Sequence, residues 1–119
     1  MTAGEATTFG TISISSRAIA TIACRAATQS YGVVGMASKN LVNGIVNALA
    51  ADPTHGVAVN ADRGRIRIDL FIVVEYGTRI ATVAHSVANA VKYQVERAIG
   101  LPVDSVDVHV QDLRVSDTD

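Results

Sequence analysis

Residues 65–75 read Arg-Ile-Arg-Ile-Asp-Leu-Phe-Ile-Val-Val-Glu, and this stretch decides the fold. Every second residue in it is a large aliphatic one: Ile66, Ile68, Leu70, Ile72 and Val74. Side chains of a strand alternate between its two faces, so the pattern predicts a long strand with one wholly apolar face. The other face carries charged residues together with Phe71 and Val73. We therefore expect helices to cover the first face only.

A long helix is expected directly after this strand, over residues 79–99. Its apolar residues recur at helical spacing: Ile80, Val83, Ala84, Val87, Val91, Val95 and Ile99. Thr78 is a plausible cap at its start, and Gly100 and Pro102 are typical stop signals at its end. This helix is the element best suited to anchor a core across the sheet.

The chain before residue 65 alternates in the same way between strand and helix patterns. Alternation predicts a strand over residues 9–15, and apolar spacing predicts a helix over 17–30. Residues 32–36 fit a turn or a tight extended link, and a second helix is expected over 39–51. A short strand at 57–59 then forms a hairpin with the long strand.

The last strand is expected over residues 105–115. Its apolar positions change phase after Val110, and a one-residue bulge near Asp112 would explain this change. The predicted order is therefore β-α-α-β-β-α-β. This order is typical of an α+β two-layer sandwich, with the helices packed on one face of a mixed sheet.

One domain accounts for nearly the whole chain of 119 residues. We place it at residues 9–115, between a flexible tail at 1–8 and a flexible acidic tail at 116–119. The start of the chain is polar and does not read as a signal peptide. The longest strongly apolar run, residues 70–74, is far too short to cross a bilayer.

The composition also limits the classes of partner. Lys and Arg number 10 against 11 Asp and Glu, and the net charge of -1 gives no general attraction to DNA or to an anionic membrane. A single cysteine, Cys24, excludes a disulfide within the chain. We therefore expect a cytoplasmic protein, with any membrane association made through a partner.

No pattern of catalytic or metal-binding residues emerges from the sequence. The histidines are His55, His85 and His109, and none belongs to a zinc signature. Asp104, Asp107 and Asp112 flank the last strand but match no calcium loop. We predict that the protein is not an enzyme, with no catalytic residue, no cofactor and no bound metal.

Two features remain as candidate binding sites. The first is a loop made of Gly32, Val33, Val34 and Gly35. A Gly-x-x-Gly loop between two helices is also found in KH domains, where it lets the backbone approach RNA, so a KH-like RNA-binding module is the alternative function. The loop carries two valines where such loops usually show a basic residue.

The second candidate site is an apolar interaction surface made of Phe71 and Val73. Both residues point away from the predicted core, and exposed apolar groups in the middle of a sheet often mark a partner site. The competing interpretation is that the second helix or a tail folds over them.

Six blocks of the sequence, taken in order, resemble the alkaline shock protein family of bacterial envelope stress response proteins. The blocks are GTISIS at 10–15, IATIA at 19–23, GVVGM at 32–36, GVAV at 56–59, IDLFIVVEYG at 68–77 and VDVHV at 106–110. Their order and spacing together carry the resemblance, which covers residues 9–115. The chain lacks the long charged tails of larger members and so resembles a short form.

This resemblance implies further properties that composition and spacing do not. Members of the family are cytoplasmic, self-associate into homo-oligomers and have no catalytic residues or cofactors. Some are held at the membrane by a small membrane-anchored family partner, and some are linked to lipid metabolism. The resemblance thus implies a non-enzymatic scaffold or adaptor whose partners are itself and such an anchored protein.

Overall fold

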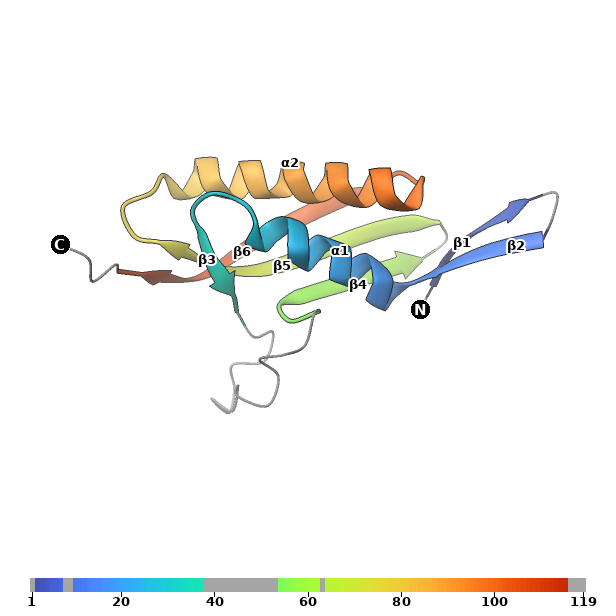
Figure 1. Cartoon of the computed structure of the whole chain (residues 1–119), viewed down its shortest axis with the longest axis horizontal. Coiled ribbons are helices and arrows are strands. Elements are labelled where there is room, and N and C mark those ends of the chain that lie inside the picture. Colours follow the sequence, from blue (N-terminus) through green and yellow to red (C-terminus); the bar gives the residue numbers. More distant parts are fainter. Residues whose placement is uncertain (1, 8–9, 38–53, 63, 116–119) are drawn as a thin grey trace.

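The computed structural model describes residues 2–7, 10–37, 54–62 and 64–115. Its elements, in chain order, are β1 (Thr2–Thr7), β2 (Gly10–Ser15), α1 (Ser16–Thr28), β3 (Val33–Met36), β4 (Val57–Asp62), β5 (Arg65–Glu75), α2 (Ile80–Ile99) and β6 (Ser105–Arg114). Both helices lie on one side of the main sheet (Figure 1), which is the predicted α+β two-layer architecture. The helix predicted at 39–51 lies outside the described residues.

Strand β5 is the centre of the main sheet. Strand β6 pairs with it in parallel along one edge, from Arg67 to Glu75. On the other edge β4 pairs antiparallel with residues 65–70, and β3 pairs antiparallel with residues 72–74. The sheet is therefore mixed, and two short strands share one edge of the long one. Helix α2 supplies the crossover that a parallel β5–β6 pair requires.

The junction between β3 and β4 lies beside Phe71. The Phe71 N–H donates to the carbonyl oxygen of Gly56 at 2.9 Å, and the Phe71 carbonyl accepts from the Ala37 N–H at 2.8 Å. These two bonds keep the backbone of β5 paired where one neighbouring strand ends and the other begins. Residues 32–36, expected as a turn or a tight extended link, have a turn at Gly32 and extended backbone after it, and the extended part is the edge strand β3.

The core lies between the helices and the alternating apolar face of β5. Five side chains of β5 are at most 1% exposed: Ile66, Ile68, Leu70, Ile72 and Val74. Helix α2 contributes Val83, Val87, Val91 and Val95 to the same cluster. Helix α1 contributes mainly alanines, and their small side chains let the two helices pack closely together.

The sequence predicts the C-terminal end of α2 correctly but not the residue that caps its N-terminal end. Gly100 takes the left-handed conformation (φ 74°) that ends the helix, as its position predicts. The N-cap is Arg79, which makes no side-chain capping bond, so the assignment of Thr78 as the cap was wrong. The Thr78 hydroxyl instead donates to the carbonyl oxygen of Glu75 at 2.7 Å and closes the β5–α2 turn.

Residues assigned to an N-terminal tail include a strand. Strand β1 pairs antiparallel with β2 to form a separate two-stranded sheet, which projects away from the helices and the main sheet (Figure 1). The tail prediction missed this hairpin. The bulge predicted in the last strand is confirmed, since the β5–β6 register shifts between Ile72 and Val73 and leaves Gln111 as the extra residue.

Candidate functional site

The side of the main sheet that faces away from the helices is here called the open face. It is built on the second set of β5 side chains: Arg65, Arg67, Asp69, Phe71, Val73 and Glu75. Directly paired residues share a face, so β6 adds Asp107, His109, Asp112 and Arg114, and β4 adds Ala58, Asn60 and Asp62. None of the described elements covers this face, and Phe71 and Val73 remain half-buried on it.

A stacked pair of rings occupies the middle of the open face. The rings of Phe71 and His109 lie 4.7 Å apart between centroids and 15° from parallel. The Nε2 atom of His109 lies 3.0 Å from Oδ1 of Asp69, with the two side chains 44% and 28% exposed. Three neighbouring residues therefore hold each other in place at the surface, and the predicted interaction residue Phe71 is the apolar member of this cluster.

Charge is distributed unevenly along the open face. Arg65 and Arg67 occupy one end of β5, and Glu75 occupies the other. Asp69 lies directly opposite Asp107 of β6, an arrangement in which two like charges repel. The contact with His109 offsets part of that repulsion for Asp69. The neighbouring strands place Asp62 opposite Arg65 and Arg114 opposite Glu75. The order of an arginine end, an aromatic centre and a carboxylate end therefore belongs to β5 itself.

The candidate loop at Gly32, Val33, Val34 and Gly35 is not a loop between two helices. Val33 to Gly35 belong to β3, which pairs with Val73 and Val74 of β5. Gly32 forms the preceding turn at φ 87°, and a Cβ added there would lie 2.7 Å from a methyl group of Val83. The assignment of these residues to a loop was wrong for Val33 to Gly35, whose backbone pairs in the sheet, and the preceding turn packs on α2. RNA binding at this segment stays a prediction.

The described residues contain no group of three or more His, Cys, Asp or Glu side chains placed to hold a metal ion. Cys24 is half-buried in α1, with its Sγ 3.6 Å from the carbonyl oxygen of His55. His55, His85 and the aspartates of β6 come from separate elements, and only His109 of the three histidines contacts a described carboxylate.

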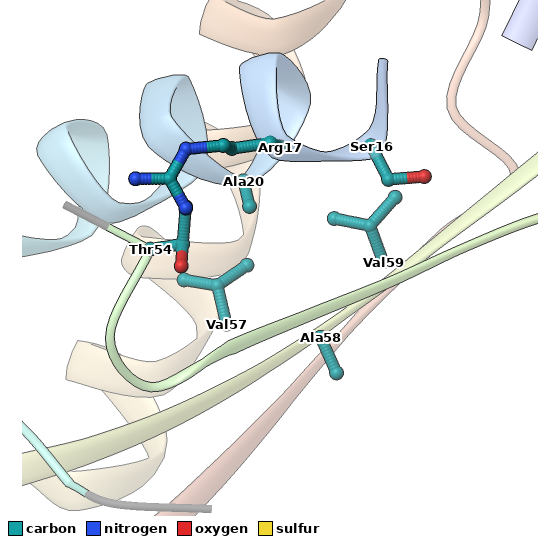
Figure 2. A pocket seen from close by; sticks show the side chains of 7 residues that line it. All are labelled: Ser16, Arg17, Ala20, Thr54, Val57, Ala58 and Val59. Carbon is teal, nitrogen blue, oxygen red and sulfur yellow. The ribbon is translucent and has the colours of Figure 1, made fainter. Parts of the chain in front are cut away.

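A shallow hollow of about 290 Å³ lies between the first turn of α1 and strand β4 (Figure 2). Its lining residues are Ser16, Arg17, Ala20, Thr54, Val57, Ala58 and Val59. Arg17 extends from the helix toward Thr54, while Val57 and Val59 point up toward the helix. These seven residues include neither a carboxylate nor a histidine that could serve as a general base.

One surface was missed by the sequence prediction. Six exposed large hydrophobic residues surround the start of α2 and the turns beside it: Tyr31, Val34, Tyr76, Ile80, Leu113 and Val115. We call this surface the apolar end; it lies where the α1–β3 turn, the β5–α2 turn and the end of β6 meet (Figure 1). Tyr31 and Tyr76, 86% and 65% exposed, each precede a glycine of positive φ, and this repeated Tyr-Gly pair was the available signal.

Comparison with models of known protein families identifies the family of this chain. A model of the alkaline shock protein 23 family, whose description is "cell envelope-related function", matches residues 4–115. The chain belongs to this family. The resemblance to alkaline shock proteins that the sequence blocks predict is confirmed by this match.

Individual alkaline shock family relatives match over most of the chain. YloU of Bacillus subtilis is 46% identical over 112 residues, which are 92% of this chain and 93% of YloU. Spy1614 of Streptococcus pyogenes is 35% identical over 108 residues, or 89% of each chain. The stress response regulator gls24 homolog of the same species is 31% identical over 86 residues, which are 72% of this chain and 47% of that protein.

Among solved structures, the copper form of MamM CTD superposes with a TM-score of 0.52 at 19% sequence identity, covering 87% of this chain and 92% of that chain. At this identity the likeness concerns the fold. In the part of the chain that the structure describes, neither helix is long and apolar enough to span a membrane.

Proposed function

We propose that this member of the alkaline shock protein family is a non-enzymatic scaffold or adaptor that associates with itself through the open face. Its family has a cell envelope-related function and includes proteins named as stress response regulators. The single observation that carries the proposal is the ring pair Phe71–His109, which stands in the middle of a sheet face that no described element covers.

The energetics of Phe71 favour a partner on this face. Full burial of a phenylalanine side chain contributes roughly 1.5–3 kcal/mol, and Phe71 has gained only part of that in the isolated chain. Aromatic residues near the centre of a surface, ringed by polar groups, are typical of the few residues that dominate binding energy. Phe71 and Val73, with charged residues around them, have this arrangement.

The location, the membrane tether and the physiological role in this proposal are taken from what membership of the family implies. We place the protein on the cytoplasmic side of the envelope, with a small membrane-anchored family partner as its tether and a role in envelope stress or lipid metabolism. The apolar end, remote from the middle of the open face, is then available for contacts with partners other than itself.

Sedimentation equilibrium of the purified full chain tests the self-association. We expect a reversible dimer with a Kd of the order of micromolar, which is about −8 kcal/mol, and we expect Phe71→Ser to weaken it at least about tenfold. Tyr93→Ser is the matched control, because Tyr93 is an exposed aromatic residue of α2 outside the open face. A wild-type chain that stays monomeric at millimolar concentration would refute the proposal.

An RNA gel shift tests the alternative function in the same samples. Specific RNA binding that weakens steeply with salt would contradict a purely protein-binding role. Two observations favour a protein partner over RNA: the Gly32–Gly35 segment pairs in the sheet, and the open face carries carboxylates beside its arginines.

A further inference from the structure

The charges on β5 form an ordered sequence along the open face. Arg67 and Glu75 lie four residues to either side of Phe71, so each is about 13 Å from it along the strand at about 3.3 Å per residue. Both side chains are exposed, and neither makes a side-chain hydrogen bond or ion pair within the described residues. Along β5, Phe71 is thus the midpoint between a cation and an anion that form no ion pair among the described residues, although Arg114 of β6 lies directly opposite Glu75.

We infer that a second copy of the chain packs on the open face with its β5 strand running antiparallel, related by a two-fold axis that passes over Phe71. This inference rests on the proposed self-association and adds its geometry. The axis lies in the plane between the two sheets, across the strands. It places the two Phe71–His109 pairs against each other at the centre, and it places Arg67 of each copy opposite Glu75 of the other.

The alternative, a parallel arrangement of the two β5 strands, is disfavoured by the same charges. It would bring Arg67 against Arg67 and Glu75 against Glu75, and like charges placed opposite each other across an interface repel. A two-fold interface uses one patch twice, so the patch must be self-complementary. The antiparallel arrangement makes the β5 pattern self-complementary, whereas the parallel one does not. At the exposed β6 edge, this arrangement also brings Asp107 near Asp112 of the other copy and Arg114 near Arg67 of the other copy. Water screens these charges there.

The dimensions of the open face suit a small dimer interface. Eleven residues give β5 a length of about 36 Å, and three strands side by side give a width of roughly 14 Å. Each copy therefore offers about 500 Å², and two copies bury about 1,000 Å², the lower limit for a specific interface. The inference thus predicts a reversible dimer rather than a permanent one.

Charge reversal tests the arrangement in solution. Arg67→Glu and Glu75→Arg are each expected to raise the dimer Kd about tenfold, which is about 1.4 kcal/mol. Combining both substitutions in one chain is expected to restore the Kd to within about threefold of wild type. Lys92→Glu is the matched control, because it changes the net charge like Arg67→Glu from the exposed outer side of α2 and should leave the Kd unchanged.

Mixing the two single variants gives the sharpest readout. In a heterodimer of Arg67→Glu with Glu75→Arg, both cross-contacts again join opposite charges, so the mixture should dimerise as tightly as wild type. If wild type dimerises but neither the mixture nor the double variant recovers, the two-fold arrangement is wrong and self-association stands. If wild type does not dimerise, both proposals fail.

Discussion

Gly56 is the residue on which the junction of the sheet most depends. Its φ of 77° lies in the left-handed region, and its carbonyl oxygen accepts the Phe71 N–H at 2.9 Å. A Cβ built on Gly56 would lie 2.8 Å from the Ala37 carbonyl oxygen and 3.0 Å from that of Phe71. Both are backbone atoms, and the bond from the Ala37 N–H to the Phe71 carbonyl oxygen ties the two residues together, so these atoms cannot move aside as a flexible side chain would.

Gly56→Ala should therefore destabilise the protein by about 3 kcal/mol. Placing alanine in the left-handed region costs about 1–2 kcal/mol, and the smaller entropy of the unfolded chain returns about 0.4–1 kcal/mol. Overpacking against fixed neighbours adds roughly 1–3 kcal/mol. The total is a large fraction of the 5–15 kcal/mol that is typical of a domain.

Gly64→Ala is the matched control for this prediction. Gly64 has nearly the same φ, 78°, but an added Cβ would meet nothing within 4 Å. Gly64→Ala should therefore lower the free energy of unfolding only through the backbone conformation, by about 1 kcal/mol or less. Urea unfolding followed by far-ultraviolet circular dichroism measures both variants. If the free energies of unfolding of the two variants agree within about 0.5 kcal/mol, the steric argument at Gly56 is refuted.

Two further predictions concern the segment from α2 to β6. Glu96→Ala should lower the free energy of unfolding by about 1–3 kcal/mol, because the Val103 N–H loses its 2.8 Å bond to Oε2 of Glu96. Glu96→Gln keeps an acceptor, so urea unfolding should show that it retains most of this free energy. Deleting Gln111 should cost less than about 1 kcal/mol, because it removes the bulge and leaves both flanking registers intact. Deleting Val108 should cost several times more, because it turns the residues beside it to the opposite face; equal losses would contradict the assigned bulge.

The sequence predicted those elements whose signal is local and repeated. The alternation in residues 65–75 and the helical spacing in 80–99 both survive in the structure as buried faces of β5 and α2. The bulge in β6 was predictable because a change of phase is visible in the sequence itself. In each case a run of ten or more residues carries the pattern.

The missed elements depend on partners that are distant in the chain. Strand β3 has four residues, one of them glycine, and is a strand because β5 offers it an edge about forty residues later. The contact between Phe71 and His109 follows from the parallel β5–β6 register, and no local sequence pattern predicts that register. The apolar end gathers Tyr31 and Tyr76 from two separate turns and Leu113 from the end of β6.

The two faces of β5 separate stability from association. Substitutions at Ile68 or Leu70 act on a core that is 0% exposed at these positions and should lower the free energy of unfolding. Substitutions at Arg67 or Glu75 act on side chains in water and should leave it nearly unchanged while altering self-association. Because the same backbone holds both sets, the open face is presented by the best-packed strand of the protein. In the proposed dimer, little order would then have to be gained on binding, which favours association through a surface of only about 500 Å² per copy.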